Sequence, residues 1–207
     1  MLPYLFHNPY FERINNKCYA GHPKDNNVEK IISNIAKHIR FRLVEVNDAE
    51  FILSLRLDPE KNRFISPVKD DIEAQRTWIR EYKNKEKNGE EYYFIIESKD
   101  SEKLGTIRLY EFRGDSFCWG SWILRHDAPA YAAIESVLCI YEIAFSRLGF
   151  MQSHTDVRKG NVAVKNFLVQ FGAVITDDDD INYYFRMTRE TFEKTRQNYR
   201  RFLVEKN

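Results

Sequence analysis

The chain of 207 residues has few cysteines, no long apolar segment and almost no excess of charge of either sign. Its cysteines are far apart and form no CxxC pair, which excludes a zinc ribbon and a disulfide framework: Cys18, Cys118 and Cys139. No apolar run approaches the roughly 18 residues that a membrane-spanning helix needs. The N-terminal stretch is too polar and aromatic for a secretory signal peptide. We therefore expect a cytoplasmic protein without a membrane segment or a metal centre.

The balance of charge excludes a further class of partner. The chain has 32 Lys and Arg residues against 31 Asp and Glu residues, which gives a formal net charge of +1. A protein that binds nucleic acid normally concentrates positive charge on one surface. The basic residues between Arg196 and Arg201 are interleaved with acids over the last predicted helix. The composition therefore favours a small-molecule or protein partner over nucleic acid.

The length suits one domain with an appendage. Residues 1–26 show no sustained period and are interpreted as an irregular arm. Residues 27–39 carry apolar side chains at i, i+3 and i+4, which predicts an amphipathic helix. We divide the chain into an N-terminal arm and helix, residues 1–39, and one larger domain, residues 40–207.

Apolar periods, capping residues and turn residues predict the elements of the larger domain. Strands are predicted at residues 41–46, 92–97, 105–112, 117–124, 150–157, 172–176 and 181–188. Helices are predicted at residues 48–57, 70–82, 131–148, 161–170 and 189–206. The result is an α+β fold (α/β mixed), with a twisted, mostly antiparallel sheet flanked by helices. One strand–helix–strand crossover creates a crevice where the pairing direction changes, and such crevices bind ligands.

The loop that leads into the helix at residues 131–148 consists mostly of small residues. Small side chains let a ligand approach the main-chain N–H groups of a helix N-terminus, where the unpaired donors and the helix dipole attract phosphate. The alternative interpretation is a tight connection without a ligand. Both interpretations remain open on the residues alone.

Several short motifs give the chain a resemblance to a known family over about residues 40–190. They are Trp122, Ile123 and Leu124 at a strand end, Ala132, Ala133, Ile134 and Glu135 at a helix start, Ala144, Phe145, Leu148 and Gly149 at its end, then Asn161 and Ala163, and finally Phe171 and Gly172. Together with the order of elements, they resemble the GNAT superfamily of acetyl-CoA-dependent N-acetyltransferases. Within it, the chain is most similar to the branch of ribosomal-protein N-terminal acetyltransferases and their small-molecule relatives.

The resemblance implies a binding site for acetyl-CoA. The pantetheine arm is expected to pair with the main chain near Ile123 and Leu124. Asn161 is expected to bond the same arm while it caps its own helix. The pyrophosphate is expected at the start of the preceding helix, where Arg125 and four main-chain amides would hold it: those of Ala130, Tyr131, Ala132 and Ala133.

The chain departs from the family pattern at residues that matter for binding and chemistry. Pro129 and Tyr131 replace two family glycines, and a proline offers no N–H to a phosphate. Cys118 stands where the family often has a glutamate, and Leu168 where it has a tyrosine that protonates the leaving thiolate. These losses shift proton transfer to other residues. They also favour, as an alternative, a GNAT fold retained as a non-catalytic binding module.

His154 and Glu111 are the candidate catalytic residues. Gln152, His154 and Asp156 share one face of their strand by the two-residue period. Histidine has an intrinsic pKa suited to a general base, although a lone histidine in a strand is more often structural. Glu111, at the end of a strand, is the second candidate, and a solvated carboxylate is the alternative there.

Residues 56–67 fall where relatives of the resembled family build the pocket for the acceptor. Arg56, Asn62 and Phe64 are therefore the candidate substrate-binding residues, against the alternative of a solvated loop.

The sequence thus predicts an acyltransferase that moves acetyl from acetyl-CoA to a primary amine, with an amino sugar or another small molecule as the favoured acceptor. Protein N-terminal acetylation is the alternative enzyme. The prediction includes no nucleic acid and no membrane partner. A homodimer is compatible with the sequence.

Overall fold

The computed structural model describes residues 31–204, so the predicted arm at residues 1–26 lies outside the described residues. In chain order the elements are β1 (Ile39–Leu43), α2 (Ala49–Leu57), α3 (Ile72–Lys87), β2 (Tyr92–Ser98), β3 (Lys103–Arg113), β4 (Ser116–Leu124), α4 (Ala130–Tyr141), β5 (Gln152–Arg158), α5 (Val162–Gln170), β6 (Val174–Asp178), β7 (Asn182–Thr188) and α6 (Arg189–Asn198). A π-helical turn, η4 (Glu142–Arg147), continues α4. From β1 onward this order matches the predicted order.

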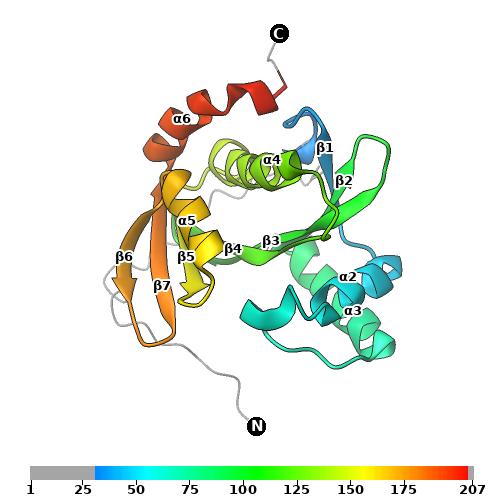
Figure 1. Ribbon diagram of the computed structural model, residues 1–207. Helices are drawn as coiled ribbons and strands as arrows, with labels where there is room; N and C mark the ends of the chain where they lie inside the picture. Colours follow the sequence, from blue (N-terminus) through cyan, green and yellow to red (C-terminus); the bar gives the residue numbers. More distant parts are fainter. Residues whose placement is uncertain (1–30, 205–207) are drawn as a thin grey trace.

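The strands form one seven-stranded sheet in the order β1-β2-β3-β4-β5-β7-β6. Neighbouring strands are antiparallel except for β4 and β5, which are parallel and are connected through α4. This sheet confirms the predicted fold class. Helices α4, α5 and α6 lie over one face of the sheet, and α2 and α3 lie under the other (Figure 1). Among residues 31–204, none of the helices has the length and apolarity of a membrane span.

Each face of the sheet has its own apolar core. Under α4, the fully buried Phe117, Tyr141 and Phe145 pack with ring centroids 5.3 to 6.1 Å apart. On the opposite face, Tyr82 of α3 packs edge-on to Tyr93 of β2, with ring centroids 6.0 Å apart. Burial of these large side chains is the main force that holds both helical layers to the sheet.

The helix predicted at residues 27–39 is wrong for its described part beyond Ile32. Asn34 has a positive φ of 51°, Ala36 bridges to Leu203, and Ile39 begins β1. The apolar residues that produced the helical period are nevertheless buried in the core under α4: Ile32, Ile35, Ala36 and Ile39. The spacing therefore predicted correctly which side chains are buried. The backbone is not helical there, because Asn34 has a positive φ and Ala36 pairs with the C-terminal segment. Residues 27–30 lie outside the described residues.

Two other helices end at different residues from those predicted. α3 continues to Lys87 through a charged stretch predicted as a loop, because Lys83 pairs with Glu86 on the next turn and with Glu45. α6 ends at Asn198, earlier than predicted, and Leu203 then pairs with Ala36. The first strand also begins two residues early, at Ile39, and ends at Leu43.

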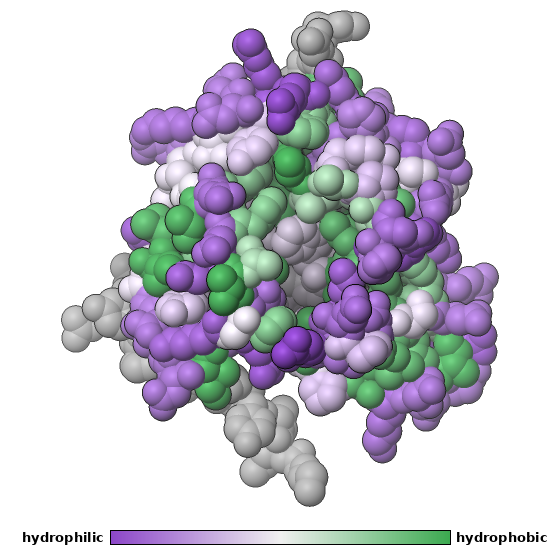
Figure 2. Space-filling view, viewed as in Figure 1, coloured by the Kyte–Doolittle hydropathy of each residue, from purple (hydrophilic) through white to green (hydrophobic). Residues whose placement is uncertain are grey.

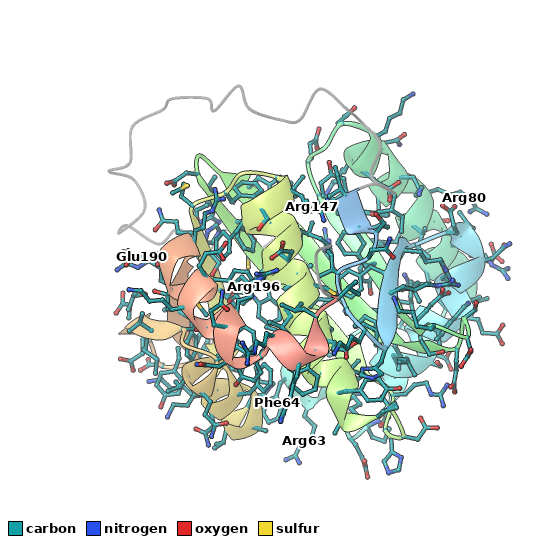
Figure 3. The ribbon with its side chains drawn as sticks, turned by 90° about the horizontal axis from the view of Figure 1, so that it is seen from above. Arg63, Phe64, Arg80, Arg147, Glu190 and Arg196 are labelled. Atoms are coloured by element: carbon teal, nitrogen blue, oxygen red, sulfur yellow. The ribbon has the colours of Figure 1, made fainter. Side chains whose placement is uncertain are left out.

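A buried ion pair fastens α6 to the end of the α4 helix. Arg196 Nε lies 3.0 Å from a carboxylate oxygen of Glu142, whose side chain is 4% exposed. Seen from above, α6 lies beside the α4 helix, and Arg196 lies between the two (Figure 3). Because a single buried charge is costly, this pair fixes how α6 sits over the core.

Candidate active site

The parallel strands β4 and β5 separate soon after they begin. They are paired only at Ser116 with Gln152 and at Phe117 with Ser153. Beyond that point a crevice of about 250 Å³ opens between them, bounded also by α5 and by residues 56–66. Figure 2 shows the hollow near the middle of this face. The crevice lies at the predicted change of pairing direction.

A β-bulge shapes the β4 wall of the crevice. The pairing with β3 shifts between Thr106 and Arg108, and Ser121 on the opposite strand has a positive φ of 47°. Any side chain at Gly120 would begin 2.8 Å from the Tyr110 hydroxyl. Among the described residues, β4 has no strand partner on its β5 side over residues 118–124. An extended ligand can therefore form main-chain hydrogen bonds along this edge.

Ile123 and Leu124 continue β4 beyond the lining of the crevice. Ile123 is buried, and its carbonyl oxygen would lie 2.3 Å from a side chain at Gly105. Glycine at position 105 thus permits β3 to approach the end of β4 closely. Pairing of a ligand with the main chain of Ile123 and Leu124 stays a prediction.

α4 begins at Ala130, after Pro129 at the N-cap, without a side chain that caps it. The Ala132 amide already donates to the Pro129 carbonyl at 2.8 Å, which leaves the earliest amides of the helix for another acceptor. Ala133 is half-buried and Ala132 fully buried, so both would act through their main chain alone. None of these residues lines the crevice, which ends short of the helix start.

Tyr131 does not obstruct the crevice. Its ring lies 4.7 Å, centroid to centroid, from the ring of His38, just before β1. Strand β1 is separated from the β4–β5 crevice by β2 and β3. The replacement of a family glycine by this tyrosine therefore leaves the ligand path open, because the side chain turns to the far end of the sheet.

Arg125 is held by acids on the surface beside the β2–β3 turn. Its guanidinium lies 2.8 Å from Glu102 and 2.5 Å from Asp127. The same side chain donates to the Lys103 carbonyl at 3.1 Å. A pyrophosphate at the start of α4 would have to compete with both carboxylates for this cation.

Asn161 forms the cap that the sequence predicted. Its side-chain oxygen accepts a hydrogen bond from the Val164 amide at 3.3 Å and begins α5. Asn161 also lines the crevice, which places its amide group within reach of a ligand there. The structural role is confirmed, and the role in binding the pantetheine arm stays a prediction.

Two of the three candidate acceptor residues, Arg56 and Phe64, line the crevice, whereas Asn62 does not. Arg56 donates to the Ser66 carbonyl at 2.9 Å. The Phe64 ring would lie 2.9 Å from a side chain at Gly160, so it packs against the turn between β5 and α5. Residues 56–66 therefore reach across the crevice, and Figure 3 shows Phe64 at this edge of the molecule. The amide of Asn62 lies 3.5 Å from the Leu57 carbonyl within the same segment.

His154 lies at the closed end of the crevice, where β4 and β5 are still paired. Its Nδ1 lies 2.6 Å from the Ser116 hydroxyl, and the residue is absent from the lining of the crevice. Burial, with a smaller contribution from the charge of Arg113, lowers the pKa of His154 from 6.5 to about 4. The imidazole is thus neutral at pH 7 and a weak base. Its assignment as the general base stays a prediction.

Glu111 also lies outside the lining of the crevice. It has a positive φ of 50° where β3 bulges, and its half-exposed carboxylate lies 2.5 Å from Arg113. Its catalytic assignment likewise stays a prediction.

The crevice contains ionisable residues that the sequence interpretation did not select: Tyr110, Asp156 and Arg158. Asp156 shares its strand face with His154, but the sequence does not show where β4 and β5 part. Cys118, at the position of the family glutamate, is buried, and burial raises the pKa of its thiol to about 12. This thiol therefore stays protonated and cannot replace the glutamate as a base.

Acidification should destabilise the fold through His154. The unfolded imidazole has a pKa of 6.5 and the folded one a pKa of about 4, so between these values the unfolded chain binds more protons. The stability that depends on the neutral imidazole is complete above pH 6.5 and is lost as the pH falls to 4, by up to about 3 kcal/mol. We expect the unfolding free energy of His154→Gln, measured in urea, to fall less between pH 6.5 and 4 than that of the wild type. His126→Gln changes an exposed histidine and is the control. An equal dependence of the unfolding free energy on pH in both variants would contradict the prediction.

Residues 38–174 match the acetyltransferase (GNAT) domain. The chain belongs to the GNAT family. It is therefore an acetyl-CoA-dependent N-acetyltransferase. The apo structure of FdhC, a nucleotide-linked sugar GNAT, has a TM-score of 0.76 and 48% identity, over 82% of this chain and 97% of FdhC. No curated protein sequence matches the chain.

Other GNAT structures are similar in fold alone. RimJ of Mycobacterium smegmatis, in complex with CoA-disulfide, has a TM-score of 0.67 and 14% identity, over 81% of this chain and 94% of RimJ. The spermidine/spermine N-acetyltransferase SpeG of Vibrio cholerae has a TM-score of 0.60 and 14% identity, over 75% of this chain and 96% of SpeG. The placement of this GNAT protein in the branch of ribosomal-protein acetyltransferases thus stays a prediction.

The residues of the crevice fit an acetyl-CoA molecule. The β4 edge offers unpaired main chain beside the cavity, and the start of α4 has no side-chain cap. The buried Thr155 hydroxyl, which lines the crevice, has no hydrogen-bond partner among the described residues. A buried hydroxyl without a partner is costly, and a polar ligand would satisfy it. Among residues 31–204, no cluster of three or more His, Cys, Asp or Glu side chains could hold a metal ion.

Proposed function

We propose that this GNAT protein transfers acetyl from acetyl-CoA to the primary amine of a nucleotide-linked amino sugar. The observation that carries the proposal is the 48% identity with FdhC, a nucleotide-linked sugar GNAT, over 82% of this chain. One side of the crevice has residues that suit such an acceptor, and the other side has main-chain groups that suit the donor.

The acceptor side of the crevice combines cations with an aromatic ring. Arg56 enters from α2 and Arg158 from β5, and a diphosphate would find a guanidinium at either position. Phe64 provides an apolar face on which a sugar or base ring can pack. A free amino sugar would leave both cations without an anionic partner, so the linked form is the better match.

The donor side is proposed from the main chain. The open edge of β4 would pair with the pantetheine arm near Ile123 and Leu124, and Asn161 would donate its amide to the same arm. The amides of Ala130, Tyr131 and Ala133 would hold the pyrophosphate together with Arg125, whereas the Ala132 amide would first have to leave the Pro129 carbonyl. This arrangement brings the thioester into the crevice from the end that α4 occupies.

The reaction needs a neutral amine and a stabilised oxyanion. A main-chain N–H near the bulge at Ser121 can donate to the carbonyl oxygen as negative charge develops on it. The crevice offers the apolar Leu168 where the family tyrosine would protonate the thiolate, so that proton must come from water or another residue. Neither His154 nor Glu111 lines the crevice, so their parts in proton removal stay predictions.

Acetylation of a protein N-terminus fits the crevice less well. A polypeptide acceptor needs an open groove in which several residues can lie. Here Phe64 packs against Gly160 and brings residues 56–66 across the crevice to the β5–α5 turn. The acceptor therefore enters a pocket rather than a channel.

Release of free thiol from acetyl-CoA tests the proposal against a panel of amines. We expect nucleotide-linked amino sugars to give a higher kcat/KM than the corresponding free amino sugars, polyamines or peptides with a free N-terminus. A preference for peptides or polyamines would overturn the proposed acceptor. If acetyl-CoA raises the Tm but no amine releases thiol, the protein is a binding module instead.

A further inference from the structure

We propose that the Asp156 carboxylate binds the amine of the acceptor and removes its proton during acetyl transfer. The inference rests on the amine acetylation proposed above. It concerns the chemistry of the site rather than the identity of the acceptor, so any amine that the enzyme acetylates can test it.

Asp156 lies on β5 beyond the point where this strand leaves β4. It is paired with Tyr184 of β7, so its main chain is held on that side. Thr155 and Val157, its neighbours in sequence, are buried on the face toward α4 and α5. The Asp156 side chain therefore projects to the opposite face, where α2 and residues 56–66 bound the crevice. This is the side on which the acceptor is proposed to bind.

Asp156 is the one carboxylate in the lining of the crevice as the described residues form it. The other ionisable residues of the lining are Arg56, Arg158 and Tyr110, none of which can accept a proton at neutral pH. Its side chain is exposed, so a ligand can reach it. An ammonium group that enters the crevice thus has one negative charge to pair with.

The carboxylate of Asp156 also differs from the buried acids of the fold. Each of those has a basic partner: Asp48 with Arg42, Glu91 with Arg108, Glu97 with Arg40, Glu135 with His38 and Glu142 with Arg196. No described Lys, Arg or His forms an ion pair with Asp156. A charged group in a crevice without a protein partner is available for a ligand.

The surroundings of Asp156 favour its role as a base. The Asp156 side chain is accessible to solvent, but the surrounding walls of the crevice partly desolvate its carboxyl group, and this raises its pKa. A hydrogen bond from its own main chain and the charge of Arg158 lower the pKa, Glu111 and Asp179 raise it, and the net shift is upward. The titratable groups around it come from every neighbouring strand: Tyr110, Glu111, Cys118, Arg158, Asp179 and Tyr184. A raised pKa makes this carboxylate a better proton acceptor than a carboxylate with the ordinary pKa of aspartate.

The proposed step balances in atoms and charge. The Asp156 carboxylate takes a proton from the bound ammonium group, which frees the nitrogen lone pair, and later releases this proton to solvent. The lone pair forms the C–N bond, and the electrons of the carbonyl π bond move to oxygen. The carbonyl then re-forms as the C–S bond breaks with its electron pair on sulfur, and the second proton of the nitrogen passes through water to the thiolate. The products are an amide, a free thiol and one proton in solvent, and Asp156 is ionised again.

Asp156→Asn tests the step in the full-length protein with the best amine of the panel. We expect kcat/KM at pH 7 to fall by about a hundredfold, within the range of general-base contributions. The variant can use only amine that is already neutral in solution, and this fraction grows about tenfold per pH unit below the pKa of the amine. The ratio of wild-type to variant kcat/KM should therefore fall by about tenfold per pH unit as the pH approaches that pKa. Asp180→Asn, the same change at an exposed turn, is the matched control and should follow the wild-type profile.

A gap that is constant with pH would overturn the proposal, because a structural defect does not depend on the ionisation of the amine. Asp156→Ser also removes the carboxylate but has a smaller side chain than Asp156→Asn, so the same result in both variants excludes a steric effect of the asparagine. The Tm of each variant shows whether it is folded. Wild-type activity on polyamines or peptides alone would refute the nucleotide-linked acceptor, while the same pH comparison on those amines would still decide the role of Asp156.

Discussion

A tryptophan in place of Val164 should abolish both acetyl transfer and the stabilisation of the protein by acetyl-CoA. Val164 lies in the first turn of α5 and lines the crevice, whose volume is about 250 Å³. An indole ring would occupy much of the space through which the thioester must pass. Because ring and thioester cannot occupy this space together, the substitution should exclude the ligand rather than merely weaken its packing. We expect thiol release to fall to the background of the assay.

Thermal unfolding separates loss of donor binding from a general defect. At a hundredfold excess over Kd, acetyl-CoA should stabilise the wild type by about 2.7 kcal/mol and raise its Tm. Val164→Trp should show no such rise. Val169→Trp places the same side chain on the same helix at an exposed position and should keep both the activity and the rise. Normal binding of acetyl-CoA by Val164→Trp would show that the crevice is not the donor site.

Much of the fold could be predicted because its signals are local. Short runs of aromatic and β-branched residues located β2, β3 and β4, and turn residues between them indicated the antiparallel meander. Asn161 caps the helix that it was expected to begin, and Asp71 caps the helix predicted at residues 70–82, each with a hydrogen bond from the amide three residues on. Helix caps and short strand-forming runs depend on neighbours within a few residues, so the sequence displays them directly.

The position of the site along β5 could not be predicted, because it depends on distant contacts. The sequence put Gln152, His154 and Asp156 on one face but did not show which of them remain beside β4. The separation of the strands follows from the bulge at Ser121 and from pairing that ends at Phe117. The histidine thus lies in the closed end of the crevice, where burial lowers its pKa, and the aspartate lies in the open part.

The direction of the Tyr131 side chain, at the position of a family glycine, could not be predicted either. A large ring at this position can fill the path of a ligand. In the fold it packs against His38, a partner far away in sequence. The same histidine bonds Glu135 on the next turn of α4, so the start of α4 and the start of β1 are joined by one polar cluster.

Glu135→Ala should destabilise the fold by about 3–5 kcal/mol, as expected when one partner of a buried polar pair is removed. The Glu135 side chain is fully buried, and its carboxyl oxygens accept hydrogen bonds from the amides of His38 and Ile39 at 2.9 and 3.0 Å. The His38 ring nitrogen lies 2.5 Å from the same group. The alanine variant would leave these donors without a partner and create a cavity beside them. Urea unfolding at pH 7 measures the loss.

Glu190→Ala is the control, because Glu190 forms an exposed pair with Lys194 on α6 and should leave the unfolding free energy unchanged. Glu135→Gln refines the measurement: both main-chain amides donate to the same oxygen, Oε2, and an amide oxygen in its place can still accept from both, so the loss should be smaller than in the alanine variant. A loss of stability in Glu135→Ala no larger than in Glu190→Ala would show that the start of β1 is held by apolar packing rather than by this carboxyl group. Within residues 31–204, β1 is an edge strand that pairs with β2 alone, so we expect the hydrogen bonds to Glu135 to contribute strongly to its place in the sheet.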